Sequence, residues 1–515
     1  MEVLGLIDVP VWFLTTLVVL VLSVWYNYGF YTHFQKYGIE GPTPLPFVGN
    51  LISALRTGFL KNEIILYQKY KHKRCYGSYL LGSTPTLTIT DIDVMKEVLV
   101  KQFNKFANRR ILTKNPAPLN KMLTTLVDDH WKHVRSMTTP AFTTGRLKNM
   151  TGLIKKAGEQ LAVNIEEKCE KNEEVDIRAM CGCFTMDVIA STMFGIAVDS
   201  QKDPNDEFVK HANEIFKFSL GNAKVLIAIM FPKLSEFLKK LGIELFNFET
   251  FNFFTQVTNQ AMKQRQETPG QFHDFLDIMI KDEVSTDQVD RKTHYPTGET
   301  MEWSSKGILR EEILAQAVIF FLAGFDTTAN TLHYLCYHLA MDQDVQNKVI
   351  EELTEAIGDS DITYENVNKL EYLDMCIQEA LRMYPPAFRF DRTCSEDVVI
   401  DGITITKGTS VGFPAYAIHF DPEIYPDPTE FNPMRYTDEE KAKRNPYHWM
   451  PFGMGPRNCP GMRLALLEMK IAAAAIMKKC KFARTPSTPA HEDLEYQMGT
   501  VRPKKPIMLK VELRD

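Results

Sequence analysis

The sequence has no cysteine pair with the C-x-x-C spacing of metal or redox sites and no excess of basic residues. Its nine cysteines are scattered over 515 residues, their number is odd, and no two have C-x-x-C spacing. This pattern argues against a disulfide framework and a zinc site, and it is typical of a reducing compartment. The net charge of -6 argues against a nucleic-acid partner. No internal repeat, low-complexity segment or shift in composition divides the body of the chain, so we expect one large domain there.

Charged residues are also missing near the N-terminus. Asp, Glu, Lys and Arg are absent from Val9 to Gln35, and Val11 to Trp25 is almost wholly apolar. About 20 apolar residues span a bilayer as a helix. Acidic residues precede this run and Lys36 follows it, which places the following chain in the cytosol. Because no small-residue cleavage site follows, residues 1–35 are predicted to be a retained membrane anchor. The alternative is an ordinary core helix.

A short connector follows the predicted anchor. Gly41 to Pro46 reads Gly-Pro-Thr-Pro-Leu-Pro, and alternate prolines give a stiff, extended chain. We therefore interpret residues 36–50 as a hinge and residues 51–515 as the main domain. A simple surface turn is the alternative for the hinge.

The main domain is predicted to be mainly α-helical with small β-sheets. Strand-like alternation of apolar and polar residues occurs at Pro85 to Thr90 and at Val398 to Ile405. Most of the remaining sequence has a helical pattern. Asp282 to Gly307 is polar and contains Pro and Gly, so we expect a long surface loop there.

One cysteine lies in a loop rich in glycine and proline. Phe452 to Gly461 reads Phe-Gly-Met-Gly-Pro-Arg-Asn-Cys-Pro-Gly, and a helical pattern runs from Met462 to Lys479. Cys459 would thus lie at a helix N-terminus, where backbone N–H groups favour the thiolate. A thiolate held in this way is a suitable axial ligand for haem iron. The alternative is a buried structural cysteine after a turn.

A long buried helix is predicted from Leu309 to His338, which contains no proline. Its middle carries the run Ala323-Gly324-Phe325-Asp326-Thr327-Thr328. An acid and a hydroxyl in a buried helix are costly unless they have a role or a partner. Ala323 and Thr327 are four residues apart and share one face. The alternative is that Thr327 bonds back to its own helix and Asp326 pairs with a base elsewhere.

Two further helical spacings place functional side chains together. Glu379 and Arg382 are three residues apart, so they can form an ion pair, although a solvated pair is the default for this spacing. Trp131 and Arg135 are four residues apart and lie on one helical face.

These motifs together resemble the cytochrome P450 superfamily. Phe452 to Gly461 matches the haem-binding signature F-x-x-G-x-R-x-C-x-G at every fixed position, and Ala323 to Thr328 is similar to the oxygen-activation motif A/G-G-x-D/E-T-T. The resemblance extends from the hinge to Pro506, and several stretches look like the animal microsomal subfamily 3A type. It implies the cytochrome P450 fold, in which haem lies between a long central helix and a cysteine loop.

The resemblance also implies roles for individual residues. Cys459 would be the axial ligand of the haem iron, and other positions match cofactor-binding residues of the family: Arg457, Trp131, Arg135, Arg392, Arg109, Phe452 and Ala323. Thr327 and Asp326 would manage protons during oxygen activation. Glu379, Arg382 and Arg435 would form a buried structural network, although Met434 and Tyr436 depart from the family pattern beside Arg435. The positions that would face substrate are Thr124, Ile319, Leu322, Ala387 and Thr500.

The function implied by the resemblance is a haem-thiolate monooxygenase. It would insert one oxygen atom from O2 into a lipophilic substrate (xenobiotic, steroid or fatty-acid-like). Its cofactor would be haem b, with NADPH electrons arriving through a cytochrome P450 reductase and cytochrome b5 as a further candidate partner. The protein would reside in the endoplasmic reticulum membrane, in contact with lipid, with its catalytic domain in the cytosol. The alternative is a haem-thiolate isomerase of the thromboxane-synthase type; a non-catalytic haem or lipid carrier is the third reading.

Overall fold

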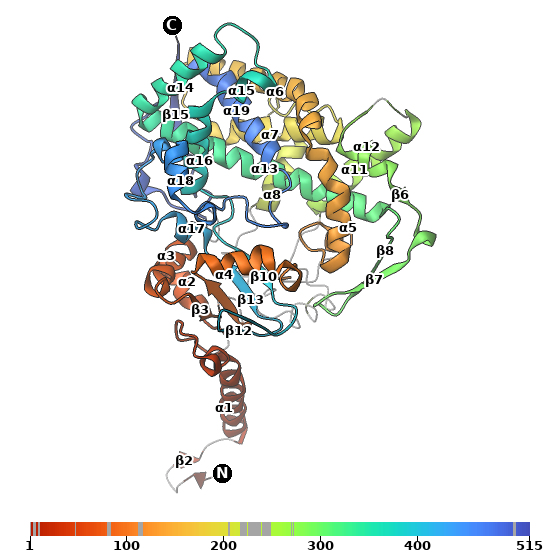
Figure 1. The fold of residues 1–515 in the computed structure, drawn as a ribbon, viewed down its shortest axis with the longest axis vertical. Coiled ribbons are helices and arrows are strands. Elements are labelled where there is room, and N and C mark those ends of the chain that lie inside the picture. The colour runs from red at the N-terminus through yellow and green to blue at the C-terminus, as the bar shows by residue number, and fades with distance from the viewer. Residues whose placement is uncertain are drawn as a thin grey trace.

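The computed structural model describes residues 2–3, 7–8, 11–46, 48–79, 84–111, 117–203, 206–216, 224, 238, 249–268, 270, 272–497 and 501–514. The described chain is mainly helical with small sheets, as predicted (Figure 1). Its α-helices are α1 (Val11–Tyr31), α2 (Leu51–Thr57), α3 (Phe59–Tyr70), α4 (Ile92–Lys96), α5 (Asp128–Thr138), α6 (Thr144–Glu170), α7 (Ile177–Phe194), α8 (Glu207–Phe216), α11 (Glu249–Glu267), α12 (Phe275–Lys281), α13 (Arg310–Met341), α14 (Gln343–Ala356), α15 (Tyr364–Val367), α16 (Glu371–Met383), α17 (Ala415–His419), α18 (Asp438–Lys443) and α19 (Met462–Met477).

The strands are short and form several small sheets. They are β1 (Glu2–Val3), β2 (Ile7–Asp8), β3 (Cys75–Ser78), β4 (Thr86–Ile89), β5 (Val175–Asp176), β6 (Glu283–Val284), β7 (Arg291–His294), β8 (Thr300–Trp303), β9 (Ile308–Leu309), β10 (Phe390–Thr393), β11 (Val398–Ile400), β12 (Ile403–Ile405), β13 (Ser410–Phe413), β14 (Cys480–Arg484) and β15 (Met508–Leu513). One sheet has the order β10-β13-β4-β3, and another has the order β14-β15-β5. In the first, Arg392 of β10 is opposite Val411 of β13, which places this arginine on a rigid element.

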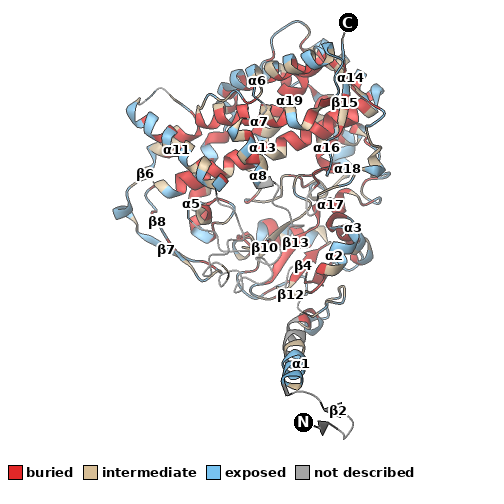
Figure 2. Cartoon of the chain, turned by 180° about the vertical axis from the view of Figure 1, so that it is seen from behind, coloured by how far each residue is buried: buried red, intermediate tan, exposed pale blue. Residues whose placement is uncertain are grey.

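Helix α13 runs through the centre of the helical body and is buried along most of its length (Figure 2). It packs closely against α7 because Gly324 has no side chain: a Cβ there would lie 2.3 Å from Ile189 Cδ1. Phe321 of α13 and Phe194 of α7 stack with ring centroids 4.0 Å apart. The predicted burial of the helix is correct, except that Ala323 and Gly324 are partly exposed to a cavity.

Helix α1 projects from the body of the protein (Figures 1 and 2). Its 21 residues span about 31 Å, close to the thickness of a hydrocarbon core. Trp12 and Trp25 are 68% and 75% exposed, so no packed core covers these apolar side chains. Two helices of the described chain, α7 and α13, are long and apolar enough to cross a membrane, but both are mostly buried in the protein; the described apolar stretch of α1, Trp12–Trp25, is shorter. Helices α7 and α13 are therefore core helices.

The predicted hinge packs against β3. The backbone N–H of Gly77 donates to the carbonyl of Glu40 over 2.8 Å, and a Cβ at Gly41 would lie only 1.8 Å from the carbonyl oxygen of Gly77. The side chain of Asn50 accepts from the N–H of Tyr79 over 2.8 Å. These contacts fix where the chain that follows α1 enters the main domain.

Most of the segment between Asp282 and Gly307 is exposed, as expected, but the expectation of a loop is wrong. The segment contains β6 and a hairpin of β7 and β8, and β9 follows it directly. Arg291 is opposite Trp303 in the hairpin, and Gly298 has a φ of +82° in the connecting turn. The hairpin was missed because its exposed residues are strongly polar and hide the period of two of its buried face.

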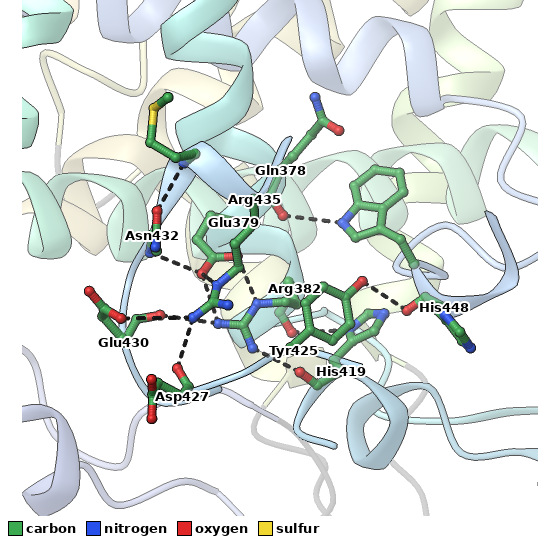
Figure 3. A network of polar contacts seen from close by, with 12 residues as sticks. Gln378, Glu379, Arg382, His419, Tyr425, Asp427, Glu430, Asn432, Arg435 and His448 are labelled. Atoms are coloured by element: carbon green, nitrogen blue, oxygen red, sulfur yellow. Dashed lines mark hydrogen bonds and ion pairs between the residues drawn. The ribbon is translucent and has the colours of Figure 1, made fainter. Parts of the chain in front are cut away.

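A buried ion network joins α16 to the chain that leads to Cys459 (Figure 3). Arg382 donates from Nε and Nη2 to the two carboxylate oxygens of Glu379, over 2.7 and 2.8 Å, and Arg435 Nε lies 3.3 Å from Glu379 Oε1. Arg382 also donates to the carbonyl of His419 over 2.8 Å. His419 Nε2 in turn accepts from the N–H of Met450 over 3.0 Å, which connects the network to the cysteine loop.

Candidate active site

The loop before α19 turns twice through left-handed backbone conformations. Gly453 and Gly455 have φ values of +68° and +77°. A Cβ at Gly455 would lie 2.2 Å from the carbonyl oxygen of Leu99, so the position is closed to side chains. The N–H of Cys459 donates to the carbonyl of Phe452 over 2.9 Å. Glycine at these two positions thus lets the loop curl back and present Cys459 just before α19.

The surroundings of Cys459 act on its thiol in opposite directions. Burial raises the pKa, and the N–H groups of Gly461 and Met462 and the charges of Arg135 and Arg109 lower it. Burial has the larger effect, so the pKa of the Cys459 thiol is raised above its ordinary value. The helix N-terminus thus acts in the predicted direction, but burial, which the sequence pattern does not show, acts against it. A metal ion bound to the sulfur would deprotonate such a thiol outright. We therefore expect the thiolate when haem is bound.

A cavity of about 650 Å³ separates the cysteine loop from α13. Cys459 and Phe452 border it on one side, and Ala323 and Thr327 border it on the other. Most of its remaining wall is apolar or aromatic, contributed among others by Phe142, Ile189, Met193, Phe320 and Leu464. This arrangement leaves a space with a largely apolar wall between the cysteine loop and the helix.

Among the arginines that line this cavity, Arg392 and Arg457 are buried and Arg109 is partly buried. Burial and the charges of neighbouring arginines lower the pKa of Arg457 to about 8 and that of Arg392 to about 9, and burial also lowers the pKa of Arg109. Asp391 is the carboxylate that opposes this effect at Arg109 and Arg392. The Nε atoms of all three arginines have no hydrogen-bond partner among the described residues. The cluster therefore holds more positive charge than its own surroundings compensate.

Trp131 and Arg135 of α5 contact Arg457 and the cysteine loop, respectively, from outside the cavity. The guanidinium carbon of Arg457 lies 4.7 Å from the centre of the Trp131 ring, and Arg135 Nη2 donates to Asn458 Oδ1 over 3.3 Å. Neither residue lines the cavity in the described part of the chain. In the structure they support Arg457 and the cysteine loop.

Asp326 and Thr327 face different spaces, although they are adjacent in sequence. Thr327 lines the cysteine cavity, and its hydroxyl donates to the carbonyl of Ala323 over 2.7 Å. Asp326 forms a close ion pair with Arg178 and a second, at 3.4 Å, with Arg502. It borders a separate cavity of about 560 Å³ near α6 and α7. Both alternatives raised from the sequence, a threonine bonded to its helix and a paired aspartate, are thus present in this structure.

The predicted substrate-facing residues divide into three groups. Thr124 and Ala387 line the cysteine cavity. Ile319 and Leu322 pack into the main core and are not among the described residues that line it. Thr500 lies outside the described residues.

Sequence reasoning missed several cavity residues. Phe320 is one of them, and the signal was available: Phe320, Ala323 and Thr327 recur at the three- and four-residue spacing of one helical face. Phe142, Ile189, Met193 and Glu468 gave no comparable signal, because distant segments bring them to the site.

The residues present fit haem. Cys459 could supply a thiolate ligand to its iron. The three arginines could supply the cationic donors that its two propionates need. The Nε atoms of these arginines lack partners among the described residues, and the pKa values of Arg392 and Arg457 are lowered. Both features are expected at a site that a bound anion completes. Haem held there would supply the redox chemistry that activates oxygen.

The arginine cluster generates a prediction for Arg392→Gln. A hydrogen bond to a charged group contributes about 1.5–3 kcal/mol, so the rate of haem transfer to excess apomyoglobin should rise at least about tenfold. Arg392→Lys, which keeps the charge but loses the fork, should give an intermediate rate. Equal rates for the wild type and Arg392→Gln would contradict the assignment of Arg392 to the propionates.

Comparison with known proteins identifies the family. The family model for cytochrome P450 matches residues 39–511. Cytochrome P450 3A5 of Homo sapiens is 37% identical, with 100% of this chain and 99% of the relative covered. Cytochrome P450 3A12 of Canis lupus familiaris is 38% identical over 100% and 99% of the two chains, and cytochrome P450 3A9 of Rattus norvegicus is 37% identical over 97% and 96%. With its cysteine loop, arginine cluster and central helix, the chain belongs to the cytochrome P450 family, as a monooxygenase with haem b as its cofactor.

Proposed function

We propose that this monooxygenase inserts one oxygen atom from O2 into a lipophilic small molecule, of xenobiotic, steroid or fatty-acid-like character, with electrons from NADPH delivered by a cytochrome P450 reductase. The observation that carries the proposal is the wall of the cysteine cavity. Phe142, Ile189, Met193 and Phe320 give it a largely apolar surface next to Cys459. Such a wall favours substrates that lose water on binding and does not select strongly among them.

Thr327 is the proposed proton-handling residue inside the cavity. Its hydroxyl hydrogen is engaged with the carbonyl of Ala323, so its oxygen is free to accept a hydrogen bond from a water molecule in the cavity. It would hold that water beside the oxygen that is being reduced. Asp326, one residue earlier, would supply protons from the second cavity. Its ion pairs with Arg178 and Arg502 hold its side chain at the border of that cavity.

The substitution Thr327→Ala tests this role. General acid–base groups contribute about 10²-fold or more, so product formation should fall by about that factor while NADPH consumption continues and peroxide accumulates. The matched control is Thr331→Ala, which removes a similar hydroxyl that donates to the carbonyl of Thr327 over 3.0 Å. It should leave the ratio of product to NADPH unchanged. Unaltered coupling in Thr327→Ala would exclude Thr327 from proton delivery.

The alternative function, a haem-thiolate isomerase, needs neither O2 nor an electron donor. No feature of the site favours it over the monooxygenase. Two results together would establish the isomerase instead. Product would form from a peroxide substrate without NADPH and reductase, and no product would form when NADPH and reductase are supplied.

We also propose that α1 anchors the protein in the endoplasmic reticulum membrane, with the catalytic domain on the cytosolic side. The proposal is supported by the apolar, exposed surface of Trp12 to Trp25 and by a helix length that matches a bilayer. Cytochrome b5 is a candidate second partner at that membrane.

Deletion of residues 1–35 tests the anchor. Because α1 projects from the body, the truncated protein should leave the membrane pellet, yet bind a full complement of haem. Flotation on liposomes and absorbance of the bound haem measure the two properties. A truncated protein that floats as the full chain does would show that other surfaces hold it to lipid, and one without haem would show that α1 belongs to the fold.

A further inference from the structure

The hairpin between α12 and α13 lies beside α5 (Figure 1). Met301 and Trp303 of β8 are buried, and the residues between and before them are exposed. Tyr295, at the end of β7, is also buried, at 5% exposure. Strand geometry puts alternate residues on one face, so the hairpin presents a defined apolar side to the protein.

A chain of hydrogen bonds runs from this hairpin through α5 to α13. The hydroxyl of Tyr295 lies 3.1 Å from His130 Nδ1, and His130 Nε2 makes a short hydrogen bond to a carboxylate oxygen of Glu312. The other oxygen of Glu312 accepts from the N–H of Leu309 over 2.8 Å. His130 and Glu312 are fully buried. A neutral imidazole that accepts from Tyr295 and donates to Glu312 satisfies every group in this chain.

Ring stacking and a second histidine strengthen the same contact. The rings of Trp303 and His130 are parallel within 3°, with centroids 5.1 Å apart. His133, one helical turn further along α5, bonds through Nε2 to the carbonyl of Gly307 over 2.9 Å. The indole N–H of Trp303 donates to Thr293 Oγ1 over 2.9 Å. The whole segment from β7 to β9 is therefore fastened to α5 at two successive turns.

The clamped helix is the one that supports the cysteine cavity. His130 immediately precedes Trp131, and successive residues of a helix point about 100° apart. Trp131 therefore faces Arg457, 4.7 Å away, while His130 faces the hairpin and Glu312. Neither Tyr295 nor His130 lines the cavity in the described part of the chain. Any movement of α5 would change the support of Arg457 and, through Arg135, of Asn458.

We propose that Tyr295 and His130 are positioning residues of the cofactor site, and that the β7–β8 hairpin is a clamp that fixes α5 and so retains haem. The hairpin and Glu312 hold α5 from two sides. Trp131 then keeps its place beneath Arg457, one of the guanidinium groups assigned to the propionates. The proposal rests on the haem assignment and is independent of the substrate.

The isosteric variant Tyr295→Phe tests the clamp in the full-length holoprotein. It keeps the ring and removes only the hydroxyl, which leaves His130 Nδ1 buried without its partner. We expect the rate of haem transfer to excess apomyoglobin to rise by a factor of about 5 to 30, the range that corresponds to the loss of one buried hydrogen bond. Hydrogen exchange should also become faster at the amides of α5.

The matched control is Tyr337→Phe. The hydroxyl of Tyr337, also buried, donates to the carbonyl of Pro489 over 2.9 Å, in a part of α13 beyond the cavity. This variant loses a comparable bond and should show wild-type rates of haem transfer and of α5 amide exchange. The proposal is overturned if Tyr295→Phe retains haem as the wild type does, or if Tyr337→Phe loses haem equally fast.

The variant His130→Gln gives a second, independent measurement. Glutamine can donate to Glu312 but cannot stack on Trp303 or reach Tyr295 in the same geometry. If the two residues act through one contact, the double variant with Tyr295→Phe should lose haem no faster than His130→Gln alone. If the rate of haem loss in the double variant equalled the product of the two single effects, a shared clamp would be contradicted.

Discussion

The site depends on one electrostatic constraint: arginine side chains of like charge lie together where little solvent reaches them. Arg109, Arg392 and Arg457 come from three distant segments and meet at one cavity. Burial lowers the pKa of all three, and the charges of neighbouring arginines lower those of Arg392 and Arg457 further. Repulsion between buried charges is strong because little solvent screens it. The protein holds Arg457 in place through the carbonyls of Ala107 and Leu126. An anionic cofactor removes the repulsion, so binding of haem and stability of this region are coupled.

The supports of the cluster lie on elements that the fold keeps rigid. Arg392 is in a four-stranded sheet, Arg457 is in the cysteine loop, and α5 stands behind Arg457 with Trp131. The network of Glu379 and Arg382 fixes the chain that enters the loop. Breaking such a buried pair costs about 3–5 kcal/mol because one charge is left uncompensated. The chemistry at Cys459 is thus set by residues that never touch the reacting atoms.

Two adjacent residues of helix α13 face two different cavities. Thr327 faces the cysteine cavity and Asp326 faces a second cavity beside α7. Because neighbouring helical residues differ in direction by about 100°, one helix can place an acid in a polar, ion-paired environment and a hydroxyl in an apolar one. One turn of the helix therefore borders both cavities.

The sequence was sufficient wherever the signal was local. The cysteine loop, the central helix and the spacing of Glu379 and Arg382 follow from short patterns, and the structure has them within a few residues of the predicted bounds. Contacts between distant segments could not be predicted: Arg178 meets Asp326 across 148 positions, and Tyr295 meets His130 across 165. The effect of burial on the pKa of Cys459 could not be predicted either, because burial depends on tertiary packing.

The most direct test of the account is the carbon monoxide difference spectrum of the reduced protein. Ligation by the Cys459 thiolate predicts a strongly red-shifted Soret band in the wild type, because the thiolate donates electron density to the iron. The variant Cys459→Ala should lose that band. A wild-type band at the position typical of histidine ligation, or a red-shifted band that survives in Cys459→Ala, would contradict the central claim that this sulfur is the axial ligand.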